Sequence, residues 1–108
     1  MAYNKVIEVD KLKAEGKWRT EIEGVAILFI YDAGEVYALQ DRCPHLGASL
    51  LKGEYTNKVI TCAKHGAQID VTTGDVLEKA KVLFLRMPTK KAKVYKTKIE
   101  NDFVWIEQ

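Results

Sequence analysis

The sequence is poor in the residues that bind metals or form disulfides, because its 108 residues include only two cysteines and two histidines. Two cysteines cannot build the disulfide framework of a small secreted protein. Long apolar runs are also missing: the longest, VAILFIY at 25–31, is too short to cross a bilayer. The first residues lack the apolar stretch of a secretory signal. We therefore expect a cytoplasmic protein that does not associate with membranes.

A large excess of charge of one sign is absent as well. Seventeen Lys and Arg residues against fifteen Asp and Glu residues give a formal net charge of +2, well short of the surplus expected of a nucleic-acid-binding protein. The stretch KKAKVYKTK (90–98) is rich in lysine, but acidic residues follow it closely. We interpret it as a solvated strand face rather than a phosphate-binding patch. The chain also lacks a glycine-rich dinucleotide fingerprint.

The composition predicts one folded domain over residues 1–108, with 47% hydrophobic and 30% charged residues. Short segments rich in β-branched and aromatic residues alternate with turn residues, which indicates an all-β fold, a small antiparallel sandwich or barrel. One brief helical turn is expected, with Asp10 as its cap and Gly16 at its end. The predicted strands are 5–9, 17–23, 25–31, 35–40, 58–62, 67–71, 82–87, 92–100 and 103–107.

All the cysteines and histidines lie in two short motifs, CPHLG and CAKHG, within predicted loops near 41–57 and 62–67. A cysteine and a histidine separated by one or two residues can turn to one point, and a β-hairpin between the loops would bring the two pairs together. We therefore predict one metal site with four ligands: Cys43, His45, Cys62 and His65.

Three interpretations of this pattern remain open at this point. The cysteines and histidines could be incidental core residues, although all four fall into one interleaved pattern. They could hold a structural zinc ion, which accepts two thiolates and two imidazoles. They could also hold an iron–sulfur cluster in which two histidines replace two cysteines on one iron.

The two motifs resemble the C-x-H-x-G and C-x-x-H-G boxes of the Rieske [2Fe–2S] domain family. Downstream, IDVTTGDVL is similar to a further family segment at Asp70, Thr73 and Gly74. The resemblance implies a basal antiparallel β-domain whose two loops form a cluster-binding tip. It also implies that the two cysteines bind one iron and the two histidines the other.

The resemblance is to the soluble Rieske ferredoxins, because Ala48 and Lys64 stand where the membrane-complex branch has a disulfide. It implies a monomeric one-electron carrier without substrate chemistry of its own. Its redox partners would be a flavin-dependent reductase and a terminal oxygenase or other oxidase. Two alternatives stay open: a zinc-stabilised binding module without a redox role, and a small Rieske subunit of a larger reductase.

Two further expectations concern the tip and its reduction potential. Apolar side chains around the histidines, with a charged rim, would form a docking surface, although two of the leucines could equally pack inward. The leucines are Leu46, Leu50 and Leu51, and the rim residues are Arg42, Lys52 and Lys64. Ala67 and Ile69 replace the serine and tyrosine that donate hydrogen bonds to the cluster in the high-potential branch, so we expect a potential low in the family range.

Overall fold

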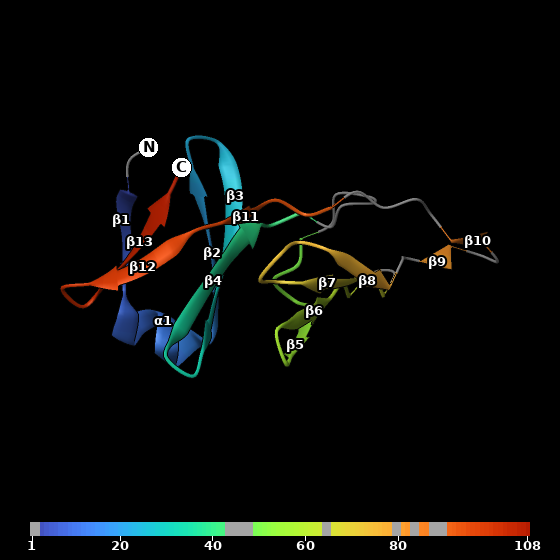
Figure 1. The fold of residues 1–108 in the computed structure, drawn as a ribbon, viewed down its shortest axis with the longest axis horizontal. Helices are drawn as coiled ribbons and strands as arrows, with labels where there is room; N and C mark the ends of the chain where they lie inside the picture. The colour runs from blue at the N-terminus through green and yellow to red at the C-terminus, as the bar shows by residue number, and fades with distance from the viewer. Residues whose placement is uncertain (1–2, 43–48, 64–65, 79–80, 83–84, 87–90) are drawn as a thin grey trace.

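The computed structural model describes the chain except residues 1–2, 43–48, 64–65, 79–80, 83–84 and 87–90 (Figure 1). In the described part, short antiparallel strands dominate and one helix is present, so the all-β prediction is confirmed. The elements are β1 (Tyr3–Glu8), α1 (Val9–Glu15), β2 (Lys17–Ile22), β3 (Val25–Asp32), β4 (Glu35–Gln40), β5 (Glu54–Thr56), β6 (Val59–Thr61), β7 (Gln68–Asp70), β8 (Val76–Glu78), β9 (Lys81–Val82), β10 (Leu85–Arg86), β11 (Val94–Tyr95), β12 (Thr97–Glu100) and β13 (Phe103–Glu107).

Three of the sheets lie as successive layers, which Figure 1 shows from left to right. The first layer has the order β1-β13-β12, and the second, which we call the central sheet, has the order β11-β4-β3-β2. The third layer, the small sheet, has the order β5-β6-β7-β8. β9 and β10 pair separately as a two-stranded hairpin. The first layer, α1 and the central sheet form the base of the molecule, and the small sheet is an excursion from it.

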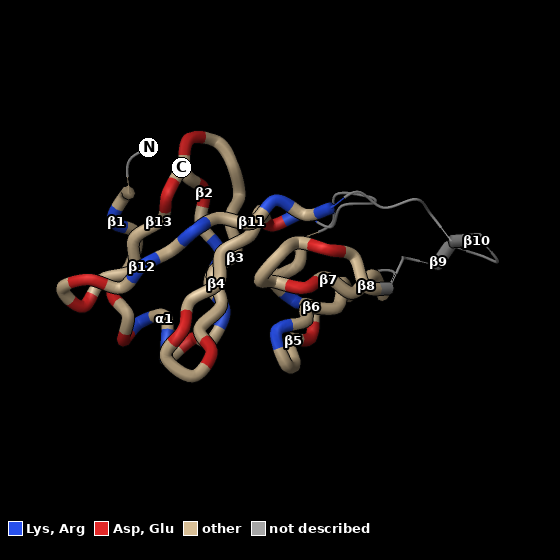
Figure 2. Tube along the Cα trace, viewed as in Figure 1, with Lys and Arg blue, Asp and Glu red and all other residues tan. Residues whose placement is uncertain are grey.

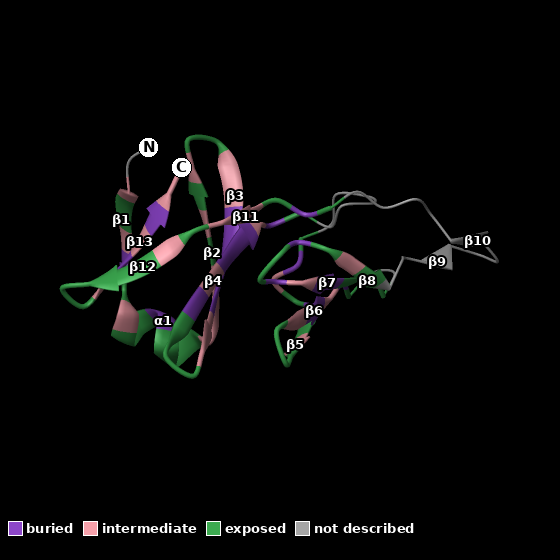
Figure 3. Cartoon of the chain, in the orientation of Figure 1, coloured by how far each residue is buried: buried purple, intermediate pink, exposed green. Residues whose placement is uncertain are grey.

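The central sheet is buried on both faces, which explains the continuous apolar run of β3. Ile27 and Phe29 belong to the core shared with α1 and the first layer, whereas Leu28 and Ile30 belong to the core shared with the small sheet. Successive strand residues point to opposite faces, so a strand covered on both sides must be apolar at every position. Figure 3 shows this buried stretch in the middle of the molecule.

Two-residue turns in the left-handed region connect the hairpins. Both residues have positive φ at Glu23–Gly24 (51° and 81°), at Ala33–Gly34 (50° and 89°) and at Asn101–Asp102 (52° and 65°). Turns of this kind match the right-handed twist of paired strands. The predicted turns at Gly24, 32–34 and 101–102 are therefore confirmed.

The single helix follows β1 and differs slightly from the prediction. Glu8 is its N-cap and makes no side-chain capping bond, whereas Asp10 lies in the first turn, where its charge favours the helix dipole. The predicted cap at Asp10 is therefore wrong, because the helix begins two residues earlier, after Glu8. Gly16 ends the helix as predicted, with φ 79° and its N–H donating to the Leu12 carbonyl.

Two predicted strands are divided and two short strands were not predicted. The segment 92–100 forms β11 and β12, because β11 pairs with β4 whereas β12 pairs with β13 in another layer. Segment 82–87 contributes to β9 and β10, with residues between them outside the described part. β5 lies within the predicted loop 41–57. β8 lies in a segment for which the sequence predicted no strand.

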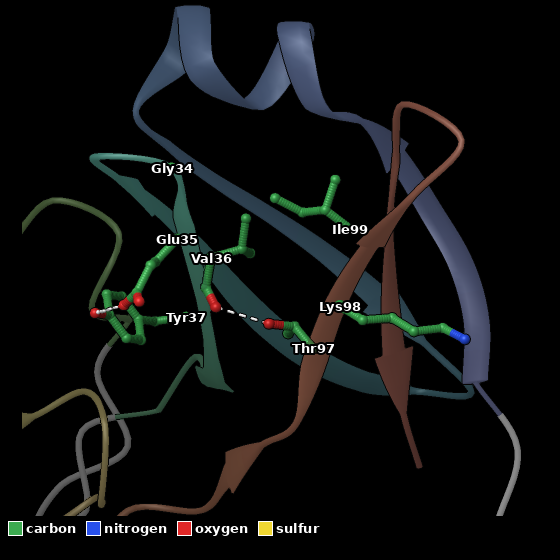
Figure 4. Close-up of a pocket in the computed structure, with 7 residues that line it drawn as sticks. All are labelled: Gly34, Glu35, Val36, Tyr37, Thr97, Lys98 and Ile99. Atoms are coloured by element: carbon green, nitrogen blue, oxygen red, sulfur yellow. Dashed lines mark hydrogen bonds between the residues drawn. The ribbon is translucent and has the colours of Figure 1, made fainter.

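The small sheet is fastened to the base by hydrogen bonds at both ends of its excursion. The Gln40 N–H donates to the Lys93 carbonyl (2.9 Å), so the chain leaves β4 and returns to β11 at adjacent positions. Tyr55 Oη donates to Asp32 Oδ2 (2.5 Å), and Lys17 Nζ donates to the Gly53 carbonyl. Within the base, Thr97 Oγ1 donates to the Val36 carbonyl (2.7 Å) and joins β12 to β4 (Figure 4).

Candidate metal centre

The second ligand loop is the connection of the β6–β7 hairpin. Thr61 and Gln68 are the last paired residues, and Cys62 follows directly. The Cys62 N–H donates to the Ala67 carbonyl (2.8 Å), and the Gly66 N–H donates to the Cys62 carbonyl (3.0 Å). Gly66 has φ 77°, a left-handed conformation that a glycine adopts without strain. These bonds hold Cys62 at the base of the loop; its partner His65 lies outside the described residues.

Cys62 has a buried free thiol, with only 1% of its surface exposed. It shares one hydrophobic core with Ala67 and Leu50, both fully buried. Leu50 lies just after the first motif, so the chain leaving the first loop packs against the base of the second. The two loops therefore start from one place in the fold, as a shared metal site requires.

Both predicted ligands of the first loop, Cys43 and His45, lie outside the described residues, as do Leu46 and Lys64. In the part that the structure describes, no three potential ligands lie together, because only Cys62 of the four is included. The donor set itself fits a [2Fe–2S] cluster with two imidazoles, since soft thiolates and imidazoles suit iron. The buried, unpaired Cys62 thiol at the base of a tight loop fits a sulfur ligand to such a group.

The family segment at 70–75 forms the turn that leads into β8. The Asp70 carboxylate accepts hydrogen bonds from Thr72 Oγ1 (2.5 Å) and the Thr72 N–H (2.8 Å), and these bonds hold the pKa of Asp70 below its ordinary value. The Gly74 N–H donates to the Asp70 carbonyl, and the Ala92 N–H donates to the Gly74 carbonyl. This turn thus joins the small sheet to the chain that returns to the base.

Two leucines of the expected tip pack inward, which is the alternative that the sequence left open. Leu50 is fully buried, and Leu51 packs partly buried against the core that the small sheet shares with the central sheet. The rim residues Arg42 and Lys52 are exposed, as expected.

The lysine-rich segment behaves as a solvated face, and Figure 2 shows acidic residues beside it. Lys91 pairs with Asp75 (3.5 Å) and Lys98 with Glu100 (3.2 Å), both on exposed side chains. Lys98 also lies over the Trp105 ring. Exposed pairs of this kind are weak, and they fit the solvated strand face that the sequence predicted.

Several open hollows lie among the described residues, and one of them is lined by Asp41 and Arg42, next to the first ligand motif. Another, with a volume of about 270 Å³, is an open depression between β4 and β12 (Figure 4). Tyr37 lines it and donates to Glu35 (2.6 Å), a bond that raises the pKa of Tyr37 to about 12. No residue of either ligand motif lines this depression, so it is separate from the candidate metal centre.

Residues 2–84 match the model of the Rieske [2Fe–2S] domain family, a range that contains both motifs and the 70–75 turn. The chain belongs to this family. The family's description names a [2Fe–2S] cluster, which is therefore the cofactor of this chain.

Rieske relatives include ferredoxin components of dioxygenase systems. The chain is 31% identical over 86 residues to the ferredoxin component of the naphthalene 1,2-dioxygenase system from Pseudomonas putida, covering 80% of this chain and 76% of the relative. It is 36% identical over 73 residues to the 3-phenylpropionate/cinnamic acid dioxygenase ferredoxin subunit from Photorhabdus laumondii, covering 67% and 69%.

A much longer protein is also similar over part of the chain. Apoptosis-inducing factor 3 from Homo sapiens is 42% identical over 50 residues, which are 46% of this chain but 8% of that protein. Among solved structures, the ferredoxin of carbazole 1,9a-dioxygenase from Nocardioides aromaticivorans shares the fold with a TM-score of 0.79 at 22% identity, over 98% of this chain and 97% of that one.

The position of Ala67 leads to a prediction about the reduction potential. We expect Ala67→Ser to raise the potential by several tens of millivolts, because a hydroxyl beside Cys62 can donate to cluster sulfur and stabilise the more negative reduced state. Protein-film voltammetry measures the shift, and Ala67→Val, which adds bulk without a donor, is the control. A downward shift in Ala67→Ser would contradict it. Ile69 is fully buried in the same core, so a tyrosine there would also overfill it.

A second prediction concerns the bond between Tyr55 and Asp32. We expect Tyr55→Phe to lower the free energy of unfolding by about 1–2 kcal/mol at neutral pH, because it removes a hydrogen bond to a carboxylate. Burial and the bond to Asp32 raise the pKa of Tyr55, so its contribution is full below the unfolded tyrosine value of about 10. The contribution is lost as the pH rises through the folded value.

Urea unfolding at neutral and alkaline pH tests this prediction. Tyr37→Phe is the matched control, because the Tyr37–Glu35 bond is exposed and joins residues of one strand. It should change stability little at neutral pH. Equal loss in both variants at neutral pH would show that the Tyr55 bond does not fasten the small sheet.

Proposed function

We propose that this protein is a Rieske-type ferredoxin, a one-electron carrier that passes electrons from a flavin-dependent reductase to an oxygenase or other oxidase. Its [2Fe–2S] cluster is held by Cys43 and Cys62 on one iron and by His45 and His65 on the other. The observation that carries this proposal is the family match over 2–84, together with the shared core under both ligand loops. Ferredoxin relatives of dioxygenase systems support the direction of transfer.

When bound, the cluster supplies a site that gains and loses one electron at a potential above that of all-cysteine ferredoxins. The protein's own residues hold the cluster and control water and partner access. The core under the loops, which includes Leu50, Cys62 and Ala67, fixes the base of the site and excludes water from it. The protein is then an electron carrier rather than an enzyme, and it exchanges electrons with the redox centres of other proteins.

The same proposal extends to organisation and location. Residues 1–108 form a single Rieske domain that acts as a monomer in the cytoplasm, without a nucleic-acid partner. In the part of the chain that the structure describes, no helix is long and apolar enough to span a membrane. The small formal net charge of the whole sequence, +2, supports the absence of a nucleic-acid partner.

A second candidate is a Rieske subunit or domain that works within a larger redox protein. The similarity to a short stretch of Apoptosis-inducing factor 3 favours it, because that relative is far longer than this chain. The two candidates differ in whether the electron partner is separate. Reduction of the purified chain by a free reductase favours the ferredoxin.

The visible spectrum and electron paramagnetic resonance of the anaerobically purified protein test the proposed function. We expect a coloured protein with two irons per chain and, after reduction, a rhombic signal typical of a Rieske centre. A colourless protein with stoichiometric zinc would overturn the proposal in favour of a zinc-stabilised module.

The exposed rim near the ligand loops gives a prediction about partner docking. We expect Lys52→Glu to change the second-order rate of electron transfer severalfold at low salt and to leave the potential nearly unchanged, because rim charges mainly set encounter rates. Stopped-flow reduction at several salt concentrations measures this rate. Lys11→Glu is the matched control: Lys11 is also exposed but lies on α1, in the base of the molecule. Equal effects in both variants would place the docking face elsewhere.

A further inference from the structure

Asp41 is the only charged side chain that the described part of the fold buries. It lies directly after β4 and two residues before Cys43, and its side chain has no exposed surface. A carboxylate taken out of water is costly unless it is fully hydrogen-bonded. Its partners should therefore show what it does.

Three donors from two different parts of the chain converge on this carboxylate. Oδ2 accepts hydrogen bonds from Arg19 Nε (2.7 Å) and Ser49 Oγ (2.6 Å), and Oδ1 accepts one from the Leu50 N–H (2.7 Å). Arg19 belongs to β2, whereas Ser49 and Leu50 follow the first ligand loop. Charge-assisted bonds of this length are the stronger kind.

These bonds connect the two ends of the loop that carries Cys43 and His45. Before the loop, the Asp41 N–H donates to the Ala26 carbonyl (2.8 Å), which fixes this residue to β3. After the loop, Ser49 and Leu50 are held by the Asp41 carboxylate, and Leu50 is buried beside Cys62. The intervening residues 42–48 are thus closed at their base by one side chain. Closing a loop between fixed ends reduces its conformational freedom.

We propose that Asp41, itself oriented by Arg19, is a positioning residue for the first ligand loop: it sets the relative placement of the loop's two ends and so holds its ligands in one arrangement for the cluster. This inference rests on the proposed function, because it assumes that the loop binds a cluster. The role is separate from ligation, since both carboxylate oxygens are already occupied by Arg19, Ser49 and Leu50. Without these bonds, the two ends of the loop would no longer be fixed relative to each other.

Asp41→Asn is the direct test because it preserves shape and replaces one acceptor oxygen by a donor NH₂. That NH₂ group would face either the Arg19 and Ser49 donors or the Leu50 N–H, so buried donors would be left unpaired. Ser49→Ala removes the bond from the Ser49 hydroxyl to Asp41, together with the longer bond that this hydroxyl accepts from the Leu51 N–H (3.2 Å), and leaves Asp41 and Arg19 in contact. Ser49→Thr keeps a hydroxyl and should rescue the effect of Ser49→Ala.

The matched control is Glu21→Gln. Glu21 contacts the same arginine at Nη2 (3.7 Å) from the exposed side and does not contact Asp41. The substitution changes one carboxylate to an amide, as Asp41→Asn does. Exposed ion pairs such as Arg19–Glu21 contribute little to stability. A general effect of altered charge near Arg19 would appear in both variants.

The experiment compares the anaerobically purified, cluster-loaded proteins by three measurements: the rate of cluster loss to a chelator, the line width of the reduced electron paramagnetic resonance signal, and thermal unfolding. We expect Asp41→Asn to lose its cluster roughly tenfold faster or more and to show a broadened signal. Ser49→Ala should lose it severalfold faster, while Ser49→Thr and Glu21→Gln should behave like the parent protein.

The outcomes separate this inference from the proposed function. A parent protein without an iron–sulfur signal would overturn the proposed function. A parent with the signal, together with an Asp41→Asn variant that melts lower but has an unchanged line width and rate of cluster loss, would show a purely structural role and overturn the inference. If Asp41→Asn yields no folded protein, Ser49→Ala decides: parent-like line width and loss rate would overturn the positioning role.

Discussion

Replacement of Cys62 by serine is expected to yield a protein without the [2Fe–2S] cluster, and Cys43→Ser should have the same effect. A serine hydroxyl is a far poorer ligand to iron than a thiolate, and Cys62 is buried at the base of its loop, where no other thiol is available among the described residues. His45→Ala and His65→Ala should abolish the rhombic Rieske signal, because an iron that lacks one imidazole is left open to water.

Iron analysis, visible absorbance and electron paramagnetic resonance of the four variants check this result. Far-UV circular dichroism shows whether the strands remain, and each variant should melt below the loaded parent, because the cluster binds only the folded chain. An unchanged Rieske signal in any variant would remove that residue from the ligand set.

The second large effect is expected at Gly74. A methyl group there would lie 2.0 Å from the Ala92 carbonyl oxygen, and the residue has φ 84°. Both the clash and the left-handed conformation oppose a side chain, so Gly74→Ala should lower the free energy of unfolding by about 2–5 kcal/mol. The contact that breaks is the one between the 70–75 turn and the chain returning to β11.

Gly34→Ala separates the two causes. Gly34 has nearly the same φ, 89°, but no atom within 4 Å of the added carbon, so it should lose only about 1–2 kcal/mol. Urea unfolding of both variants gives the difference. Equal losses would mean that the Ala92 backbone moves aside without cost.

The sequence predicted well what depends on local signals. Segments 35–40 and 103–107 are strands with those bounds, because β-branched and aromatic residues fill them and turn residues flank them. The ligand motifs were recognisable because cysteine and histidine occur nowhere else in the chain. Family membership followed from the same spacing.

Features that depend on distant partners could not be predicted in this way. Segment 92–100 reads as one strand, and only the pairing of β11 with β4 and of β12 with β13 divides it. For Leu50 the sequence left inward packing and exposure equally open, and only its packing in one core with Cys62 shows that it is buried. The sequence did not mark Asp41 as a residue that holds the first ligand loop, because its hydrogen-bond donors come from β2 and from residues after the loop. A charged residue just before a ligand motif could still have been marked for closer attention.

The bond between Gln40 and Lys93 has a consequence for how the chain could tolerate change. The chain leaves the base at Gln40 and rejoins it at Lys93, and a hydrogen bond joins these two residues. The segment between them can therefore change in length without altering this contact. Added residues in an exposed part of this excursion raise the closure entropy only logarithmically. The strands of the base would keep their register while the small sheet and its loops became longer or changed in sequence. The base and the small sheet are therefore free to diverge at different rates.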